Sequence, residues 1–154
     1  MMEFVHDFKK YPEMTNTQLQ ESAFMSPFPQ ITEDFRAKVV KVHDGDTITV
    51  RTDFRDFDFP VRFLNIDAPE LNAGGETARD WLISRIEGQM VDVLIDPENR
   101  VGKYGRLLGR VFHLGTDVGL DEINLGLALP FSNRREGQIP DINKELRVKQ
   151  WLSM

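Results

Sequence analysis

The sequence contains no cysteine, which excludes disulfide bonds, thiolate metal sites and a cysteine nucleophile. It also contains no run of about eighteen apolar residues, and Met1 to Lys10 lack the basic start and apolar stretch of a secretory signal. We therefore predict neither a membrane span nor export by a signal peptide. The expected location is intracellular or within a larger assembly.

The chain also has few histidines and no excess of positive charge. Its three histidines are scattered without the spacing of a zinc site, so any metal ion would have to be held by oxygen ligands. The net charge of -6 gives no general affinity for phosphates. A nucleic-acid-binding protein with this composition must gather its positive charge locally.

The length of 154 residues allows one modest hydrophobic core with additional segments at its ends. Residues 1–35 combine mixed charges, prolines and aromatic residues without a steady period, and they are too aromatic for the composition typical of disorder. We interpret them as an N-terminal arm that packs either on its own domain or on a partner protein. Residues 36–132 are predicted to form the globular domain, and residues 133–154 a loop and helix that pack on it.

The central region predicts a small barrel. Alternating or continuous apolar residues, many of them β-branched, indicate strands over residues 38–42, 47–52, 57–66, 90–95 and 106–114. Helical spacing indicates helices over residues 78–86 and 118–125, ended by Gly88 and Gly126. This order is that of a five-stranded oligonucleotide-binding (OB) barrel. The predicted fold class is therefore α+β, mainly β, with two or three helices.

Acidic residues occur at the ends of two predicted strand segments. Asp44 and Asp46 stand at the end of the first hairpin, and Asp67 and Glu70 stand at the end of the third strand. If these ends meet, the four acids form either a site for a hard metal ion or an acid–base site. Taken alone, the sequence Asp44-Gly45-Asp46 favours a solvated turn.

Basic residues occur in two separate segments. Arg62 lies on a strand among apolar neighbours, where it can pair with an acid across the sheet or direct its guanidinium at a phosphate. Residues 100–106 combine Lys103, Tyr104 and Arg106 with glycines, although such a stretch can also be a solvated loop. Taken together, the acids and arginines predict metal-assisted hydrolysis of a phosphodiester.

These motifs, in this order, resemble the staphylococcal nuclease, or thermonuclease-like, family over residues 38–128. The matching motifs are Asp44-Gly45-Asp46-Thr47, Arg62 with Asp67-Ala68-Pro69-Glu70, Lys103-Tyr104-Gly105-Arg106, and Gly126-Leu127-Ala128. The resemblance implies an OB-fold nuclease domain that uses one calcium ion (Ca2+) and acts on DNA or RNA. The family's usual products carry a 3′-phosphate, and we expect the same here.

The resemblance also implies a set of metal ligands. Asp46 and Asp67 match the calcium carboxylates of the family, and the backbone carbonyl of Ala68 matches a further ligand. Asp44 matches an acid that reaches the ion through water. Ala68 stands where the family often has a hydroxyl residue, which a ligand carbonyl tolerates.

Catalytic and substrate-binding roles follow from the same resemblance. Glu70 matches the proposed general base that activates the attacking water. Arg62 and Arg106 match the arginines that hold the phosphate and stabilise the transition state. Lys103 and Tyr104 match residues that contact a neighbouring phosphate of the substrate.

Two other functions are compatible with this barrel. One is a non-catalytic module that binds nucleic acid or peptides, and the other is an assembly role in which residues 1–35 dock the domain on a protein partner. The catalytic acid and both arginines are present, and inert versions of the barrel typically lack them. We therefore favour the nuclease, while the choice between DNA and RNA and between internal and terminal cleavage is left open.

Overall fold

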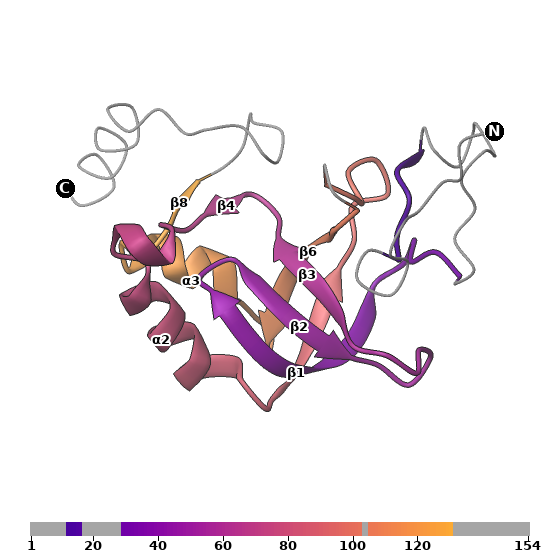
Figure 1. The fold of residues 1–154 in the computed structure, drawn as a ribbon, viewed down its shortest axis with the longest axis horizontal. Helices are drawn as coiled ribbons and strands as arrows, with labels where there is room; N and C mark the ends of the chain where they lie inside the picture. Colours follow the sequence, from indigo (N-terminus) through magenta and orange to yellow (C-terminus); the bar gives the residue numbers. More distant parts are fainter. Residues whose placement is uncertain (1–11, 17–28, 103–104, 131–154) are drawn as a thin grey trace.

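A computed structural model describes residues 12–16, 29–102 and 105–130 of the chain. Its centre is a barrel of five strands: β1 (Phe35–Asp44), β2 (Thr47–Arg51), β3 (Phe59–Phe63), β5 (Met90–Leu94) and β6 (Leu107–His113). Neighbouring strands in the order β3-β2-β1-β5-β6 are antiparallel, and a parallel pairing of β3 with β6 closes the barrel (Figure 1). The predicted mainly β OB fold is confirmed.

Shorter elements connect and cover the strands. They are β4 (Ile66–Asp67), the 3₁₀ turn η1 (Leu71–Ala73), α2 (Glu76–Ile86), β7 (Thr116–Asp117), α3 (Val118–Asn124) and β8 (Leu129–Pro130). Strand β4 pairs with β8, and β7 pairs with β6. Figure 1 shows α2 and α3 on the same side of the barrel. Neither of these helices is long and apolar enough to cross a membrane.

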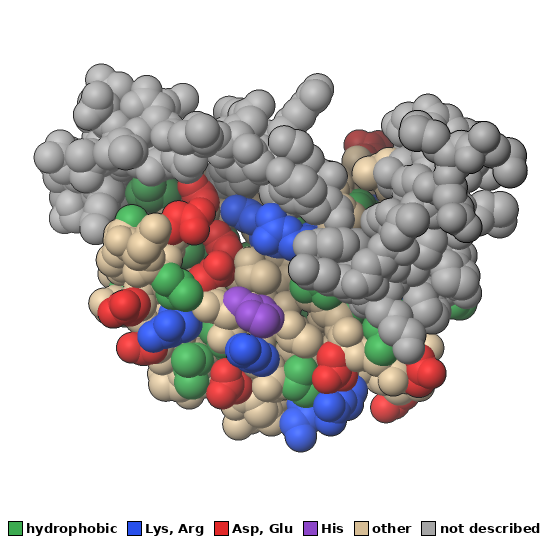
Figure 2. Space-filling model, in the orientation of Figure 1, with side chains coloured by type: hydrophobic (Ala, Val, Ile, Leu, Met, Phe, Trp, Pro, Cys, Tyr) green, Lys and Arg blue, Asp and Glu red, His purple; other side chains and the backbone are tan. Residues whose placement is uncertain are grey.

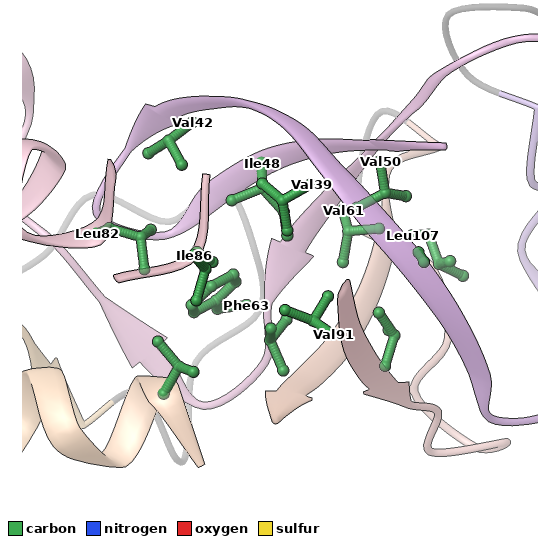
Figure 3. Packing of buried hydrophobic residues seen from close by; sticks show 14 of the residues in the cluster. Val39, Val42, Ile48, Val50, Val61, Phe63, Leu82, Ile86, Val91 and Leu107 are labelled. Atoms are coloured by element: carbon green, nitrogen blue, oxygen red, sulfur yellow. The ribbon is translucent and has the colours of Figure 1, made fainter. Parts of the chain in front are cut away.

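The core fills the inside of the barrel and the space beneath α2. Buried residues alternate with more exposed ones along β1 and β5, as expected when one face of a strand packs inward. Figure 3 shows Phe63 of β3 close to Ile86 of α2. Leu82 and Ile86 are completely buried, so α2 is fixed to the barrel by its apolar face.

The predicted strand over residues 57–66 is interrupted in the structure. It is divided into β3 and β4 because the chain turns between them, where Asn65 has a φ of 70°. Asparagine adopts this left-handed conformation more readily than most residues. Pro60, which indicated an edge or a bulge, lies one residue before the part of β3 that pairs with β6. The turn gives Asp67 and the residues after it a new direction.

The predicted helix ends are confirmed at two glycines. Gly88 follows α2 with a φ of 81°, and Gly126 follows α3 with a φ of 74°. Glycine takes this conformation without the steric cost that a side chain would add. The expected C-terminal helix within residues 133–154 lies outside the described residues.

The described parts of the N-terminal arm pack on the barrel. Glu13 is completely buried and forms ion pairs with Arg55 and Arg100, the latter with Oε2 and Nη1 3.5 Å apart. Arg100 also donates hydrogen bonds to the carbonyls of Ile31, at 2.8 Å, and Met14, at 3.1 Å. Residues 12–16 lie at the side of the barrel away from α2 and α3 (Figure 1). These contacts join both described pieces of the arm to the globular domain.

Candidate active site

The hairpin end and the segment after β4 meet, which is the condition that the sequence analysis set for a shared acidic site. The backbone N–H of Ala68 donates a hydrogen bond of 3.0 Å to Oδ2 of Asp46. The backbone carbonyl of Asp46 accepts a hydrogen bond of 2.7 Å from Phe63 at the end of β3. Asp46 is therefore held by β3 and by the residue that follows β4, and its side chain is 10% exposed.

Arg62 of β3 lies where these segments meet. Its Nη2 is 3.4 Å from Oδ2 of Asp46 and 3.6 Å from Oδ1 of Asp67. Its Nη1 donates to the carbonyls of Phe63, at 2.8 Å, and Ile66, at 3.2 Å. These contacts bring three predicted site residues together and fix the plane of a buried guanidinium.

Gly45 allows the acidic turn to approach its neighbours closely. A Cβ atom at this position would lie 2.7 Å from Cβ of Ala68 and 2.9 Å from Cβ of Ala78 in α2. Real Cβ atoms do not come this close to other carbon atoms, because the packing of a protein interior leaves no room for such overlap. The glycine therefore lets the turn that carries Asp46 sit directly against Ala68.

The turn also holds two carboxylates side by side. The backbone N–H of Asp46 donates a hydrogen bond of 3.0 Å to Oδ1 of Asp44. Burial raises the pKa of Asp44 above its usual range, and the nearby charge of Asp46 raises it further. Excess negative charge at this turn favours a bound cation.

Glu122 of α3 is a further acid at this site, and the sequence analysis did not assign it. Its side chain is completely buried, and burial raises its pKa to about 9, with Asp46 and Asp44 adding to the shift. A usable signal was present, because Glu122 follows the apolar Val118 by four residues and so shares its helix face. Val118 is completely buried in the structure.

Glu70 lies on the same continuous segment as Asp67 and Ala68. It is exposed and stands immediately before η1, where its carbonyl accepts hydrogen bonds of 2.9 Å from Ala73 and Gly75. These bonds close a tight turn after the acidic segment. The predicted base is therefore close in sequence to the metal-ligand candidates and accessible to solvent.

Arg106 lies next to the strand that closes the barrel with β3. It is half-buried immediately before β6, and Arg62 of β3 pairs with Leu108 two residues further along. The carbonyl of Arg106 accepts a hydrogen bond of 2.8 Å from Gly102, which closes the loop before β6. Lys103 and Tyr104 of that loop lie outside the described residues. Figure 2 shows acidic and basic side chains adjoining on this face of the molecule.

Arg100 has a different environment from the one that the sequence suggested. The basic stretch of residues 100–106 was interpreted as a source of positive charge for a phosphate ligand. In the structure Arg100 is 3% exposed and its guanidinium faces Glu13 of the N-terminal arm. It therefore anchors the base of the loop and adds no charge to the surface.

The residues expected to hold a metal ion offer oxygen atoms, which hard divalent cations prefer as ligands. Within the described ranges, no three or more His, Cys, Asp or Glu side chains are grouped closely enough to hold a metal ion. The expected set needs only the carboxylates of Asp46 and Asp67 and the carbonyl of Ala68. Calcium accepts such oxygen ligands and completes its coordination with water.

Comparison with known proteins identifies a family. The family model described as "Staphylococcal nuclease homologue" matches residues 60–150, which is more than half of the chain. The matched range contains Arg62, Asp67, Glu70 and Arg106 and begins after Asp46. The contacts of Asp46 with Arg62 and Ala68 thus connect the preceding hairpin to the matched region.

Individual relatives agree with this match. A protein from Escherichia coli O157:H7 named an uncharacterized endonuclease is 36% identical over 90 residues, which are 58% of this chain and 56% of that protein. A protein from Shigella flexneri named micrococcal nuclease is 42% identical over 80 residues, covering 51% of this chain and 43% of that protein. A probable endonuclease from Leptosphaeria maculans is 24% identical over 132 residues, covering 79% of this chain and 38% of that protein. The chain spans about half the length of these relatives, or less.

Proposed function

The chain belongs to the staphylococcal nuclease homologue family, and on this premise we propose that it is a calcium-dependent nuclease that hydrolyses phosphodiester bonds of DNA or RNA. The observation that carries the proposal is the position of Arg62 between two carboxylates, Asp46 and Asp67. A guanidinium and a pair of oxygen ligands at one place suit a phosphate that binds together with a metal ion. The nuclease names of the relatives support the same reaction.

Each residue of the site has a defined task in this reaction. Asp46, Asp67 and the carbonyl of Ala68 would hold the ion, which supplies positive charge next to the phosphoryl oxygens. Glu70 accepts a proton from the attacking water, and the oxygen of that water forms a bond to phosphorus. The bond from phosphorus to the 5′ oxygen breaks, and this oxygen takes up a proton from solvent. The products are a 3′-phosphate and a 5′-hydroxyl.

The arginines stabilise the charge that develops on the phosphoryl oxygens. Arg62 is suited to this task because the carbonyls of Phe63 and Ile66 already fix its orientation. A fixed charge needs little rearrangement when the transition state forms, so its stabilising effect is retained. Arg106 would add a second guanidinium from the residue immediately before β6, the strand that pairs with β3.

The proposal is tested by incubating the purified chain with single-stranded DNA and with RNA, in calcium and in EDTA. We expect cleavage in calcium, none in EDTA, and products with 3′-phosphate ends. Equal cleavage in EDTA would contradict the role of calcium. Absence of cleavage by the folded protein under all these conditions would favour the alternative of a non-catalytic binding or assembly module.

A further inference from the structure

Glu122 reaches the acidic turn from the interior of the protein. It belongs to α3, far along the chain from the β1–β2 hairpin, yet its Oε1 lies 3.1 Å from the position that a Cβ on Gly45 would take. Gly45 stands between Asp44 and Asp46. The carboxyl group of Glu122 therefore lies directly behind the turn that carries a predicted calcium ligand.

This carboxyl group has no hydrogen-bond partner on either oxygen among the residues that the structure describes. Its side chain is also completely buried. Burial of a polar group without a partner costs free energy, because the group loses its hydrogen bonds to water. Such groups are uncommon in native proteins, and a bound water or ion is one of the reasons that accounts for them.

The surroundings of Glu122 favour a cation over another anion or an apolar ligand. Asp44 and Asp46 are its acidic neighbours, and both raise its pKa. Arg62 already contacts Asp46 and Asp67 together with two backbone carbonyls. Three acids therefore surround one glycine, and a divalent cation at Asp46 would favour the ionised form of each of them.

We propose that Glu122 is a fourth acidic residue of the cation site, in addition to Asp44, Asp46 and Asp67, and strengthens calcium binding from beneath the Asp44–Asp46 turn. This inference rests on the calcium site of the proposed function. Glu122 acts as a positioning residue through water, and through its charge once a bound cation favours its ionised form, since the described residues hold no group of three acids close enough for direct coordination. Loss of a residue that supports metal ligands from outside the ligand set typically lowers metal affinity by about 10- to 100-fold.

A role in the cation site and a purely structural role predict opposite effects of substitution. If Glu122 were needed only for packing, its replacement would destabilise the protein and leave calcium affinity unchanged. If it serves the cation, a neutral or apolar replacement removes a buried, unpartnered carboxyl, so the calcium-free protein becomes no less stable. Calcium affinity then falls.

The test compares Glu122→Gln and Glu122→Leu with the original chain. Calcium affinity is measured by titration calorimetry, and calcium-free stability is measured by urea unfolding. We expect the dissociation constant for calcium to rise about tenfold or more in both variants, with unchanged or higher stability. Glu98→Gln, which neutralises an exposed loop residue, serves as the matched control and should change neither quantity.

Three outcomes would overturn the inference. If the original chain binds calcium and the folded Glu122 variants bind it equally well, the role of Glu122 is refuted and the calcium site itself stands. A loss of stability in both variants without a loss of affinity assigns Glu122 to packing. If neither the original chain nor its Asp46→Asn variant shows calcium binding in the calorimeter, the calcium site of the proposed function fails as well.

Discussion

The guanidinium of Arg62 lies against the carboxylate of Asp46, with Nη2 3.4 Å from Oδ2. The pairing of β2 with β3 sets Thr47 opposite Arg62, so the register of the barrel holds these two charged residues next to each other. Asp67 joins them at 3.6 Å from the same nitrogen. The closed barrel thus determines the geometry of the proposed site.

Replacement of Arg62 by lysine tests whether the shape of the guanidinium matters for the fold. Lysine keeps the charge, but its single ammonium group cannot reproduce the separate bonds to Phe63, Ile66 and Asp46. We expect Arg62→Lys to lower the free energy of unfolding by about 2 to 4 kcal/mol, measured by urea denaturation. Arg36→Lys, at an exposed position of β1, is the control. Equal stability of the two variants would contradict this interpretation.

The pH dependence of stability tests the environment of Glu122. Its pKa is about 9 in the folded protein, against a usual value of 4.5 that applies to the unfolded chain. Below pH 4.5 Glu122 is protonated in both the folded and the unfolded chain. Between pH 4.5 and about 9 it is protonated only in the folded chain. Unfolding therefore releases a proton, and this contribution to stability is lost as the pH rises toward 9.

In calcium-free buffer, this proton release reduces the free energy of unfolding by up to about 1.4 kcal/mol per pH unit. Glu122→Gln should reduce this slope, because the glutamine has no proton to release. Asp44 contributes a slope of the same sign, since its pKa is also raised. Parallel pH profiles for the original chain and the glutamine variant, measured by urea unfolding, would contradict the buried environment of Glu122.

The barrel and half of the site follow from local patterns in the sequence. Alternating apolar residues indicated the five strands, and glycines at positions 88 and 126 indicated the helix ends. The acids at the turn and after β4 could be placed together because a hairpin and the next strand are neighbours in most small sheets. The roles of Asp46, Asp67 and Arg62 were predicted from the resemblance to the nuclease family.

Glu122 and Glu13 could not be placed in this way. Each contacts residues that are distant in the sequence, so no local period indicates the partner. Glu122 meets Gly45 only because α3 packs against the hairpin end, and Glu13 meets Arg55 and Arg100 only because the arm folds back. The tertiary packing of the chain, and not its local secondary-structure propensity, determines which residues these two glutamates contact.

The cluster of Glu13, Arg55 and Arg100 gives a prediction for the N-terminal arm. Glu13→Ala would leave two buried arginines without their acid, and removal of one partner from a buried ion pair is strongly destabilising. We expect a loss of about 3 to 5 kcal/mol in the free energy of unfolding, measured by urea denaturation. Glu33→Ala, at an exposed position nearby, should change little. Similar stability of both variants would show that the cluster is dispensable.

Deletion of residues 1–35 tests the two readings of the arm directly. Because Glu13, Met14 and Ile31 are buried against the barrel, we expect the shortened chain to lose cooperative unfolding, measured by circular dichroism. Docking on a protein partner stays a prediction for this segment. A shortened chain with unchanged stability would indicate that the arm serves a partner and not its own domain.

The measurement that tests the nuclease assignment most directly is the rate of calcium-dependent cleavage by Glu70→Gln and Arg106→Ala. Each variant lacks one group assigned to the transition state, so we expect each rate to fall by about 100-fold or more with an unchanged circular dichroism spectrum. Glu98→Gln and Arg36→Ala, at exposed positions away from the site, should retain the original rate. Folded Glu70 and Arg106 variants that cleave as fast as the original chain would contradict the assigned active site.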